Sequence, residues 1–152
     1  MSDTLTFFLA GIIQGSLPDA IHDQDYRAEI GRMVRRHFPD ASVFDPFADH
    51  PDSLAYDPER GRAVFFDLMD RARESDVVIA FVPEASMGTA IEMWRAHRAG
   101  RVVVAVSPLA ENWVVRFTTD RVVPDVAGLE RLFASGELAA LLAERRTWPE
   151  VD

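Results

Sequence analysis

Glu92 is the residue of this sequence best placed to do chemistry. It follows Ser86, Gly88 and Thr89 in the stretch PEASMGTAIEM, which comes directly after a strongly apolar run. We expect a helix to begin at Thr89, so that Glu92 lies in its first turn. The dipole and the free N–H groups of a helix N-terminus favour the charged form of a carboxyl group. An ionised, oriented carboxylate is suited to attack an electrophilic sugar carbon.

The same spacing has a second, purely structural interpretation. Thr89 and Glu92 form the T-x-x-E pattern of a capping box, in which the glutamate only folds back on the start of its helix. Under the chemical interpretation, Gly88 opens access to the carboxylate, and the Ser86 hydroxyl can contact an anionic group of a substrate. The pattern by itself leaves both interpretations open.

The glycine-bearing segment 11–16 is the second candidate for ligand contact. Gly11 and Gly15 enclose a short stretch that includes Ile13 and Gln14. Glycine lets the backbone turn freely and approach a ligand closely, although a plain strand-to-helix turn explains these residues equally well. The segment matches neither the GxGxxG nor the GxxxxGKS/T phosphate-binding pattern.

Two aspartates add a candidate general acid. Asp67 and Asp70 share one face of an expected helix, because residues three apart in a helix are neighbours. Asp67 stands among apolar residues in the sequence, and an apolar environment favours the protonated form of a carboxyl group, which suits a general acid. For Asp70 we prefer a solvated acidic face.

The composition excludes several kinds of chemistry. The chain has no cysteine, which rules out disulfides and thiol catalysis, and its 4 histidines lack the spacing of a zinc site. The leading hypothesis, given below, needs no metal and no organic cofactor. The formal net charge of −9 disfavours a nucleic-acid polymer as partner. A small anionic ligand is compatible with this charge, since a nest of backbone N–H groups can bind one phosphate.

These residues must be positioned by strand-length apolar runs that alternate with helix-length amphipathic segments. The expected strands are residues 5–10, 42–45, 77–82, 102–106 and 121–123. The expected helices are residues 24–37, 59–74, 89–98, 126–134 and 137–146, and residues 48–58 are expected to form a surface loop. Runs that are apolar at every position indicate strands buried on both faces, as in a parallel sheet.

We therefore predict one α/β domain over residues 1–152, a doubly wound, flavodoxin- or Rossmann-like five-stranded parallel sheet flanked by helices. In the order 2-1-3-4-5, the first and third strands are neighbours, and ligands bind in the crevice at such a switch point. This order brings segment 11–16 opposite segment 83–92.

The N-terminal segment and the hydropathy predict the compartment. The chain begins without the basic residues of a secretory signal, and no apolar run approaches the roughly 18 residues that span a bilayer. We expect a cytoplasmic protein without a membrane partner.

Two runs resemble the nucleoside 2-deoxyribosyltransferase superfamily, namely FFLAGIIQGS and SDVVIAFVPEASMGTAIEMWRAHRAGRVVVAVSP. The resemblance covers residues 7–116, and GTAIE is its most specific element. Members of this superfamily cleave the N-glycosidic bond of nucleosides or nucleotides. The resemblance implies that Glu92 attacks the anomeric carbon to form a covalent glycosyl-enzyme, and that Asp67 helps to bind and protonate the base. Another base then takes the sugar in the transferases, and water takes it in the hydrolases.

Two positions depart from the usual pattern of that superfamily. Ser86 stands where transferases acting on free nucleosides carry an aspartate, and serine there resembles the branch that hydrolyses nucleoside 5′-monophosphates. A neutral hydroxyl tolerates a phosphate dianion, whereas a carboxylate repels it. Phe8 stands where many members have a tyrosine beside the nucleophile, so the hydroxyl that orients the glutamate there is missing.

The resemblance also implies an oligomer. In that superfamily a polar residue of a neighbouring subunit completes each site from the segment after the fourth strand. Asn112 is the matching residue here, which implies a homodimer or a larger homo-oligomer. An ordinary turn residue is the structural alternative at this position.

The leading hypothesis is an enzyme that cleaves the N-glycosidic bond of nucleoside 5′-monophosphates through a covalent glycosyl-glutamate at Glu92, with Asp67 as general acid. The expected substrate contacts are Phe8, Gly11, Ile13, Gln14, Gly15, Ser86, Gly88 and Asn112. One alternative is a deoxyribosyltransferase that exchanges bases on free deoxynucleosides. A second is a non-catalytic nucleotide-binding module, which Phe8 favours, and a third is a flavodoxin-like domain that contacts other proteins.

Overall fold

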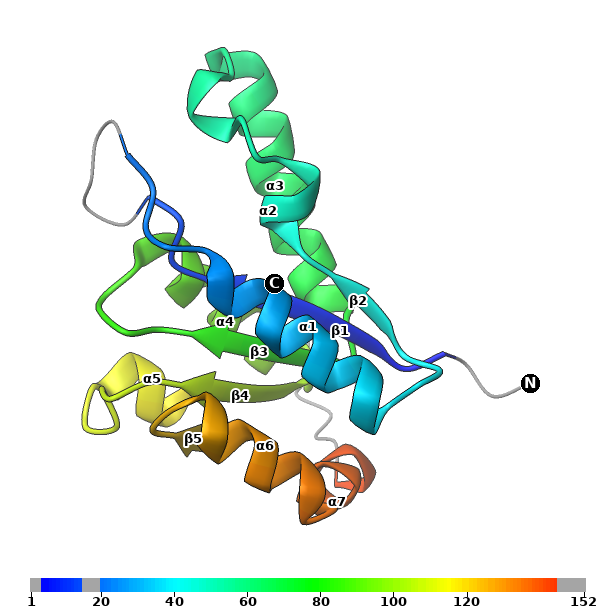
Figure 1. Ribbon diagram of the computed structural model, residues 1–152. Coiled ribbons are helices and arrows are strands. Elements are labelled where there is room, and N and C mark those ends of the chain that lie inside the picture. The colour runs from blue at the N-terminus through cyan, green and yellow to red at the C-terminus, as the bar shows by residue number, and fades with distance from the viewer. Residues whose placement is uncertain (1–3, 15–19, 145–152) are drawn as a thin grey trace.

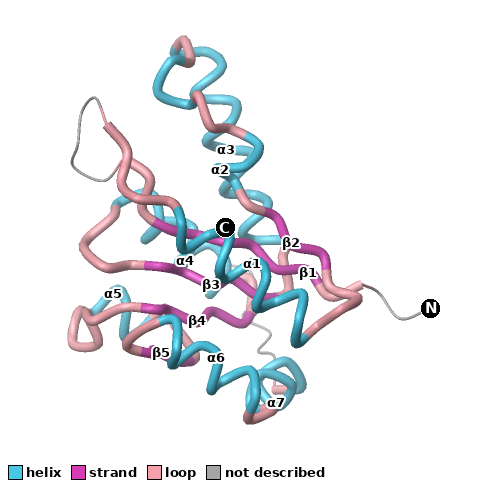
Figure 2. Tube along the Cα trace, viewed as in Figure 1, coloured by secondary structure: helices cyan, strands magenta, loops and turns pink. Residues whose placement is uncertain are grey.

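A five-stranded parallel sheet forms the centre of the protein (Figure 1 and Figure 2). The computed structural model describes residues 4–14 and 20–144. The strands are β1 (Thr6–Gly11), β2 (Ser42–Phe44), β3 (Val77–Phe81), β4 (Val102–Val106) and β5 (Arg121–Val123). Their spatial order is β2-β1-β3-β4-β5, and every neighbouring pair is parallel. The predicted fold class and strand order are confirmed.

Helices cover both faces of this sheet, because each central strand is apolar on both of its sides. Phe7 and Leu9 of β1 pack into the core on one face, while Phe8 and Ala10 pack into the core on the other. The first core includes side chains of α1 (Asp25–His37), α6 (Val126–Ala134) and α7 (Glu137–Ala143). The second includes side chains of α3 (Pro58–Glu74), α4 (Met87–Arg98) and α5 (Trp113–Phe117).

Two expectations about local structure were wrong. Residues 48–58, expected to be a loop, contain the end of the short helix α2 (Pro46–Asp49) and the 3-10 turn η1 (Ser53–Ala55). Asp45 caps α2 through its side chain, and Pro46 occupies the first helical position, where its missing N–H costs nothing. The helix α5 was not predicted at all. Asn112 begins it by accepting hydrogen bonds from Val114 N and Val115 N.

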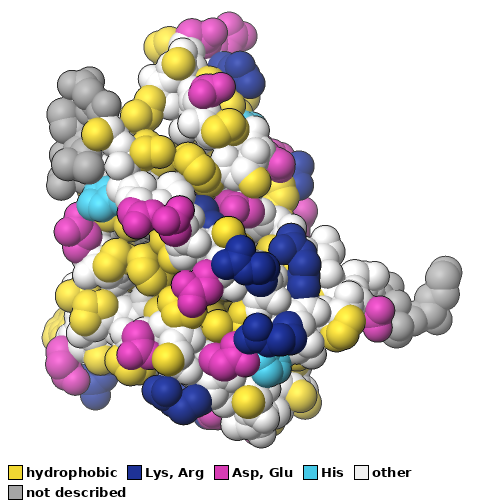
Figure 3. All heavy atoms as spheres, in the orientation of Figure 1, with side chains coloured by type: hydrophobic (Ala, Val, Ile, Leu, Met, Phe, Trp, Pro, Cys, Tyr) yellow, Lys and Arg dark blue, Asp and Glu magenta, His cyan; other side chains and the backbone are white. Residues whose placement is uncertain are grey.

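One part of the second layer extends past the sheet. We call residues 53–66, which comprise η1 and the first half of α3, the α3 arm; it rises from the body of the molecule (Figure 1). The buried residues of α3, Met69 and Ala72, both belong to its second half. Hydrophobic side chains gather on the surface of this projecting part (Figure 3), where Phe66 is 59% exposed.

No helix within the described residues is long and apolar enough to cross a membrane.

Candidate active site

The strands β1 and β3 end side by side, so their carboxyl ends lie at the same end of the sheet. Gly11 pairs with Phe81 at the end of the register, and Ile12 N donates to Phe81 O at 3.4 Å just beyond it. The segment after β1 therefore starts directly beside the segment after β3, as the strand order predicted. Of the predicted ligand contacts here, Ile13 is half-buried and Gln14 is exposed. Gly15 lies outside the described residues.

Helix α4 begins earlier than the sequence suggested, and this moves Glu92 away from the helix end. Ser86 is the N-cap, accepting from Thr89 N at 3.4 Å, and its Oγ lies 2.9 Å from Thr89 Oγ1. Glu92 consequently stands in the second turn of α4. The capping-box interpretation of Thr89 and Glu92, left open by the sequence, therefore does not hold. The expectation that free N–H groups of the helix end hold the Glu92 carboxylate was wrong as well.

Glu92 is buried, with only 8% of its surface exposed. Burial raises the pKa of Glu92 to about 8, against the opposing pull of the positive charge of Arg27. Glu92 is thus mostly protonated near neutral pH, and not ionised as expected. Within the described residues, its carboxyl group makes no hydrogen bond and no ion pair.

Arg27 is a buried cation that the sequence analysis missed. Its guanidinium donates to Leu9 O at 2.9 Å and to Gly11 O at 3.1 Å, and it pairs with Asp45 Oδ1 at 3.1 Å. A further hydrogen bond reaches Gln24 Oε1 at 2.6 Å. These four bonds fix the charge against the end of β1. Its position three residues before the core residue Ile30 is the pattern that could have revealed it.

Tyr26 is the second functional candidate that the sequence analysis missed. Its ring stacks on Phe81, with centroids 4.0 Å apart, and its hydroxyl donates to Ile12 O at 3.3 Å. A Cβ at Gly11 would lie 2.1 Å from that hydroxyl. The Tyr26 phenol therefore explains the glycine at position 11. Burial raises the pKa of Tyr26 well above its usual range, so this group stays a phenol.

The side chain of Phe8 is fully buried on the face that α4 covers. It stacks on Phe44 with centroids 5.6 Å apart. Gly88, in the first turn of α4, has open space where a Cβ would stand. Packing by the described residues therefore does not require glycine at position 88.

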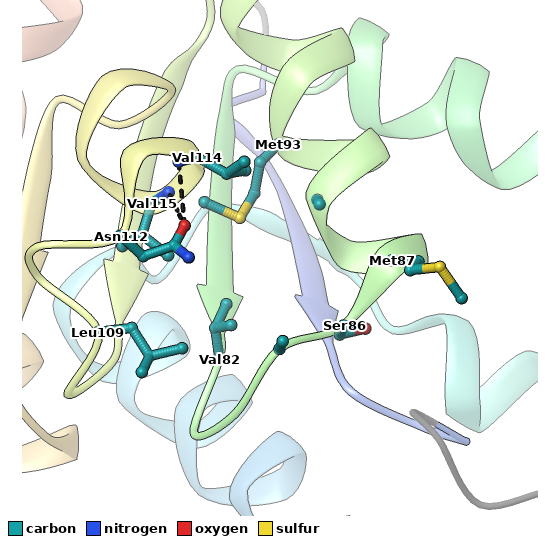
Figure 4. A pocket seen from close by; sticks show the side chains of 10 residues that line it. Val82, Ser86, Met87, Met93, Leu109, Asn112, Val114 and Val115 are labelled. Carbon is teal, nitrogen blue, oxygen red and sulfur yellow. Dashed lines mark hydrogen bonds between the residues drawn. The ribbon is translucent and has the colours of Figure 1, made fainter.

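A cavity of about 270 Å³ lies between the start of α4 and α5 (Figure 4). Ser86 and Asn112 both line it, so the fold brings these two predicted residues together within one chain. Figure 4 shows the amide nitrogen of Asn112 pointing toward the cavity while Oδ1 caps α5. The Ser86 hydroxyl points away from it, toward the start of α4 (Figure 4). The remaining lining is mostly apolar, and it includes Met93 but not Glu92.

Asp67 does not have the apolar surroundings that its sequence neighbours suggested. Its side chain is 54% exposed and forms an ion pair with Arg71 Nε at 2.8 Å. Its neighbours Phe65 and Phe66 are exposed too, because this part of α3 leaves the sheet. Asp70 is exposed and pairs with Arg95 at 2.6 Å, which confirms a solvated face for this residue.

A metal centre finds no support in the described ranges 4–14 and 20–144. No group of three or more His, Asp or Glu side chains is placed there to hold an ion.

The sheet order and the buried carboxyl group at its switch point define a doubly wound α/β protein with one candidate site above β1 and β3. No protein-family model and no curated protein sequence matches the chain. Solved structures do share its fold. A 2-deoxyribosyltransferase from the psychrotolerant bacterium Bacillus psychrosaccharolyticus has a TM-score of 0.64 at 17% identity, over 82% of this chain and 90% of that one.

Two further structures are similar. A conserved protein from Enterococcus faecalis V583 has a TM-score of 0.63 at 19% identity, over 88% of this chain and 99% of that one. A CMP N-glycosidase from Clostridium botulinum has a TM-score of 0.48 at 17% identity, over 86% of this chain and 98% of that one. The likeness to the first two proteins confirms the fold that the sequence resemblance implied.

Proposed function

We propose that this protein cleaves the N-glycosidic bond of nucleoside 5′-monophosphates, with Glu92 as the nucleophile. The observation that carries the proposal is a buried glutamate, on the helix that follows β3 at the switch point of the sheet, whose pKa is raised by burial while the charge of the buried Arg27 opposes that rise. A desolvated carboxylate is a stronger nucleophile than a hydrated one, and the Arg27 guanidinium stabilises its charge. The fold shared with a 2-deoxyribosyltransferase agrees with this chemistry.

The reaction follows from these groups in two steps. The ionised Glu92 attacks the anomeric carbon, the carbon–nitrogen bond breaks, and its electron pair leaves with the base, which takes up a proton. Water then attacks the same carbon of the glycosyl ester, the bond from that carbon to the Glu92 oxygen breaks, and the sugar phosphate and the free carboxylate are released while one water proton passes to solvent. Arg27, held by two backbone carbonyls, keeps a positive charge in place that favours the ionised form of Glu92.

The start of α4 supports a monophosphate as substrate. Ser86 contributes a neutral hydroxyl group there, hydrogen-bonded at 2.9 Å to the hydroxyl of the buried Thr89, and a side chain at Gly88 would meet open space. The N–H groups of a helix N-terminus attract a phosphate, and a neutral hydroxyl does not repel it. Transfer to a second base, on free deoxynucleosides, is the alternative outcome of the same chemistry.

The working form in this proposal is a homodimer in which a second copy covers the apolar side of the second layer. Met87, Ile91 and Trp94 are exposed at the spacing of one helical face of α4. Exposed side chains continue this surface on α3 and α5: Phe65, Phe66, Trp113, Val114 and Phe117. Soluble monomers seldom expose apolar surface of this extent. The sequence resemblance, which implies that Asn112 at the start of α5 reaches a neighbouring subunit, supports this proposal.

Chromatography of reaction products tests the function. The protein is incubated with a panel of nucleosides and their 5′-monophosphates, with and without a second base. We expect free base from the monophosphates with the wild-type protein and none with Glu92→Gln, which keeps the shape of the side chain. Glu59→Gln, an exposed site at the start of α3, is the control and keeps full activity.

Three other results would overturn the proposal. Full activity of Glu92→Gln would remove the nucleophile. Base exchange without hydrolysis would identify a transferase. Nucleotides that raise the melting temperature without any product would identify a binding module.

A further inference from the structure

The cavity between the start of α4 and α5 has an apolar inner wall. Val82, Met93 and Val115 line it, and each of them is at most 4% exposed. Met87 and Val114 line it too but are exposed, so they belong to its mouth. An apolar cavity of about 150 Å³ is large enough for benzene, so the volume of about 270 Å³ here accommodates an aromatic ring with a substituent. The thioether sulfur of methionine favours contact with an aromatic ring, and two methionines line this cavity.

The polar groups of this wall already have their partners. Val82 N donates to Val106 O at 2.9 Å, and Val82 O accepts from Ser107 Oγ at 2.6 Å. The Ser86 hydroxyl is hydrogen-bonded to that of Thr89 and points away from the cavity (Figure 4). None of the described residues that line the cavity is charged. A phosphate or a nucleobase would therefore lose hydrogen bonds to water there without replacing them, whereas a neutral and largely apolar molecule would not.

The side-chain amide of Asn112 is the exception in this apolar lining. Its Oδ1 accepts from Val114 N at 3.0 Å and from Val115 N at 3.3 Å, which fixes the orientation of the amide. The amide nitrogen points toward the cavity (Figure 4) and makes no hydrogen bond to any residue that the structure describes. Because the helix cap already holds this side chain, it can donate to a ligand without a further loss of conformational freedom. The cavity therefore offers one fixed donor, which requires one acceptor on the ligand.

We propose that this cavity is a binding site for a small, neutral aromatic molecule with one hydrogen-bond acceptor. The ring packs on the buried side chains of the inner wall, and the acceptor receives a hydrogen bond from the Asn112 amide. Glu92 does not line the cavity, so this site is separate from the proposed nucleophile and does not rest on the proposed function. The ligand also contacts Met87, the first residue of α4, and thereby holds the start of that helix.

Two probes that differ in the acceptor test this site. Acetophenone and isopropylbenzene have nearly the same shape, but only acetophenone has a carbonyl oxygen. Their binding is followed by NMR of the protein labelled with 13C at its methionine methyl groups. We expect both probes to shift the signals of Met87 and Met93, and to leave those of Met33 and Met69, which are buried elsewhere, unchanged. Acetophenone should bind about two- to tenfold more tightly, which is the gain from one hydrogen bond.

Two variants separate the hydrogen bond from the apolar contact. Asn112→Asp keeps the oxygen that caps α5 and removes the amide donor, so the preference for acetophenone should disappear while isopropylbenzene still binds. Ala90→Leu, on the α4 side of the cavity, fills it and should abolish the shifts with both probes. Ala139→Leu, exposed on α7, is the matched control and should bind both probes as the wild type does. The melting temperature without probe checks that each variant is folded.

The proposal fails on any of three results. Equal affinities of the two probes for the wild-type protein would remove the role of Asn112. Unchanged binding in Ala90→Leu would place the probes elsewhere. Binding that weakens as the protein concentration rises would mean that a second copy fills the cavity in the proposed dimer, whose interface includes Met87 and Val114. An affinity that does not depend on the protein concentration supports the small molecule as the occupant.

Discussion

The two carboxyl groups predicted to act together, Glu92 and Asp67, lie in opposite environments. Glu92, on α4 at the end of the sheet, is buried and has no hydrogen bond to any residue that the structure describes, and burial raises its pKa to about 8. Asp67 stands where α3 leaves the sheet, more than half exposed and paired with Arg71. Both have apolar neighbours in sequence. The burial of each carboxyl group therefore depends on whether its helix lies over the sheet, and it does not follow from the types of the residues next to it in the sequence.

The largest expected effect is the loss of activity when Glu92, the buried carboxyl group of the two, is replaced. Glu92→Gln should lower kcat by at least about a thousandfold, because the amide cannot form the glycosyl ester. Product chromatography over long incubations measures the residual rate. Glu92→Asp keeps the carboxylate on a side chain one methylene group shorter, and it should retain more activity than Glu92→Gln. Equal rates for the two variants would argue against attack by this carboxylate.

The second effect is the pH dependence of stability that the burial of Glu92 produces. The pKa of Glu92 is about 8 in the folded protein and about 4.5 in an unfolded chain. Between these values the folded protein keeps a proton that the unfolded chain releases. The contribution of Glu92 to the free energy of unfolding is therefore complete below pH 4.5. It falls by about 1.4 kcal/mol per pH unit and is lost as the pH rises through 8.

Glu92→Gln removes this dependence. Its free energy of unfolding, relative to the wild type, should rise between pH 5 and pH 8, as followed by urea titration at several pH values. Glu59→Gln, which changes an exposed carboxylate, should follow the wild-type curve. Parallel curves for Glu92→Gln and the wild type would mean that Glu92 is ionised in the folded protein.

A third test concerns the close approach of Tyr26 to β1. Gly11→Ala places a Cβ 2.1 Å from the Tyr26 hydroxyl and 2.8 Å from Cζ of its ring. The stacked ring must move, and we expect a loss of about 1–3 kcal/mol in the free energy of unfolding, measured by urea denaturation. Gly61→Ala, in the α3 arm with no atom within 4 Å of the new Cβ, should instead stabilise by about 0.5–1 kcal/mol. Equal stability of Gly11→Ala and the wild type would contradict the packing described here.

The sheet could be predicted from the sequence because its signal is local and repeated. The runs Val77–Phe81 and Val102–Val106 are apolar at every position, which indicates burial on both faces, and the alternation with helices then restricts the strand order. The start of α4 could not be predicted in the same way. Ser86 and Thr89 are both good N-cap residues, and only the packed structure selects Ser86.

The charged surroundings of Glu92 could not be predicted, since they include side chains of a distant segment. Tyr26 and Arg27 lie on α1, which covers the opposite face of the sheet, and no spacing in the sequence links them to α4. Helix α5 was missed for another reason. Its sequence WVVRF consists mainly of residues that favour strands, so the capping side chain of Asn112 is its clearest signal.

The smallest expected effect tests whether the exposed site belongs to the chemistry. Asp67→Asn breaks an exposed ion pair between two residues one helical turn apart. We expect the free energy of unfolding to fall by no more than about 0.5 kcal/mol. If a second copy covers α3 at Asp67 and Asp67 acts as the general acid, kcat should fall by about tenfold to a hundredfold. Asp70→Asn, which breaks the neighbouring pair with Arg95, is the control and should keep its activity. Sedimentation of both variants checks that the oligomer is intact. Unchanged kcat in Asp67→Asn would mean that the base takes its proton from solvent. Of the two carboxyl groups, only the buried Glu92 would then take part in the reaction.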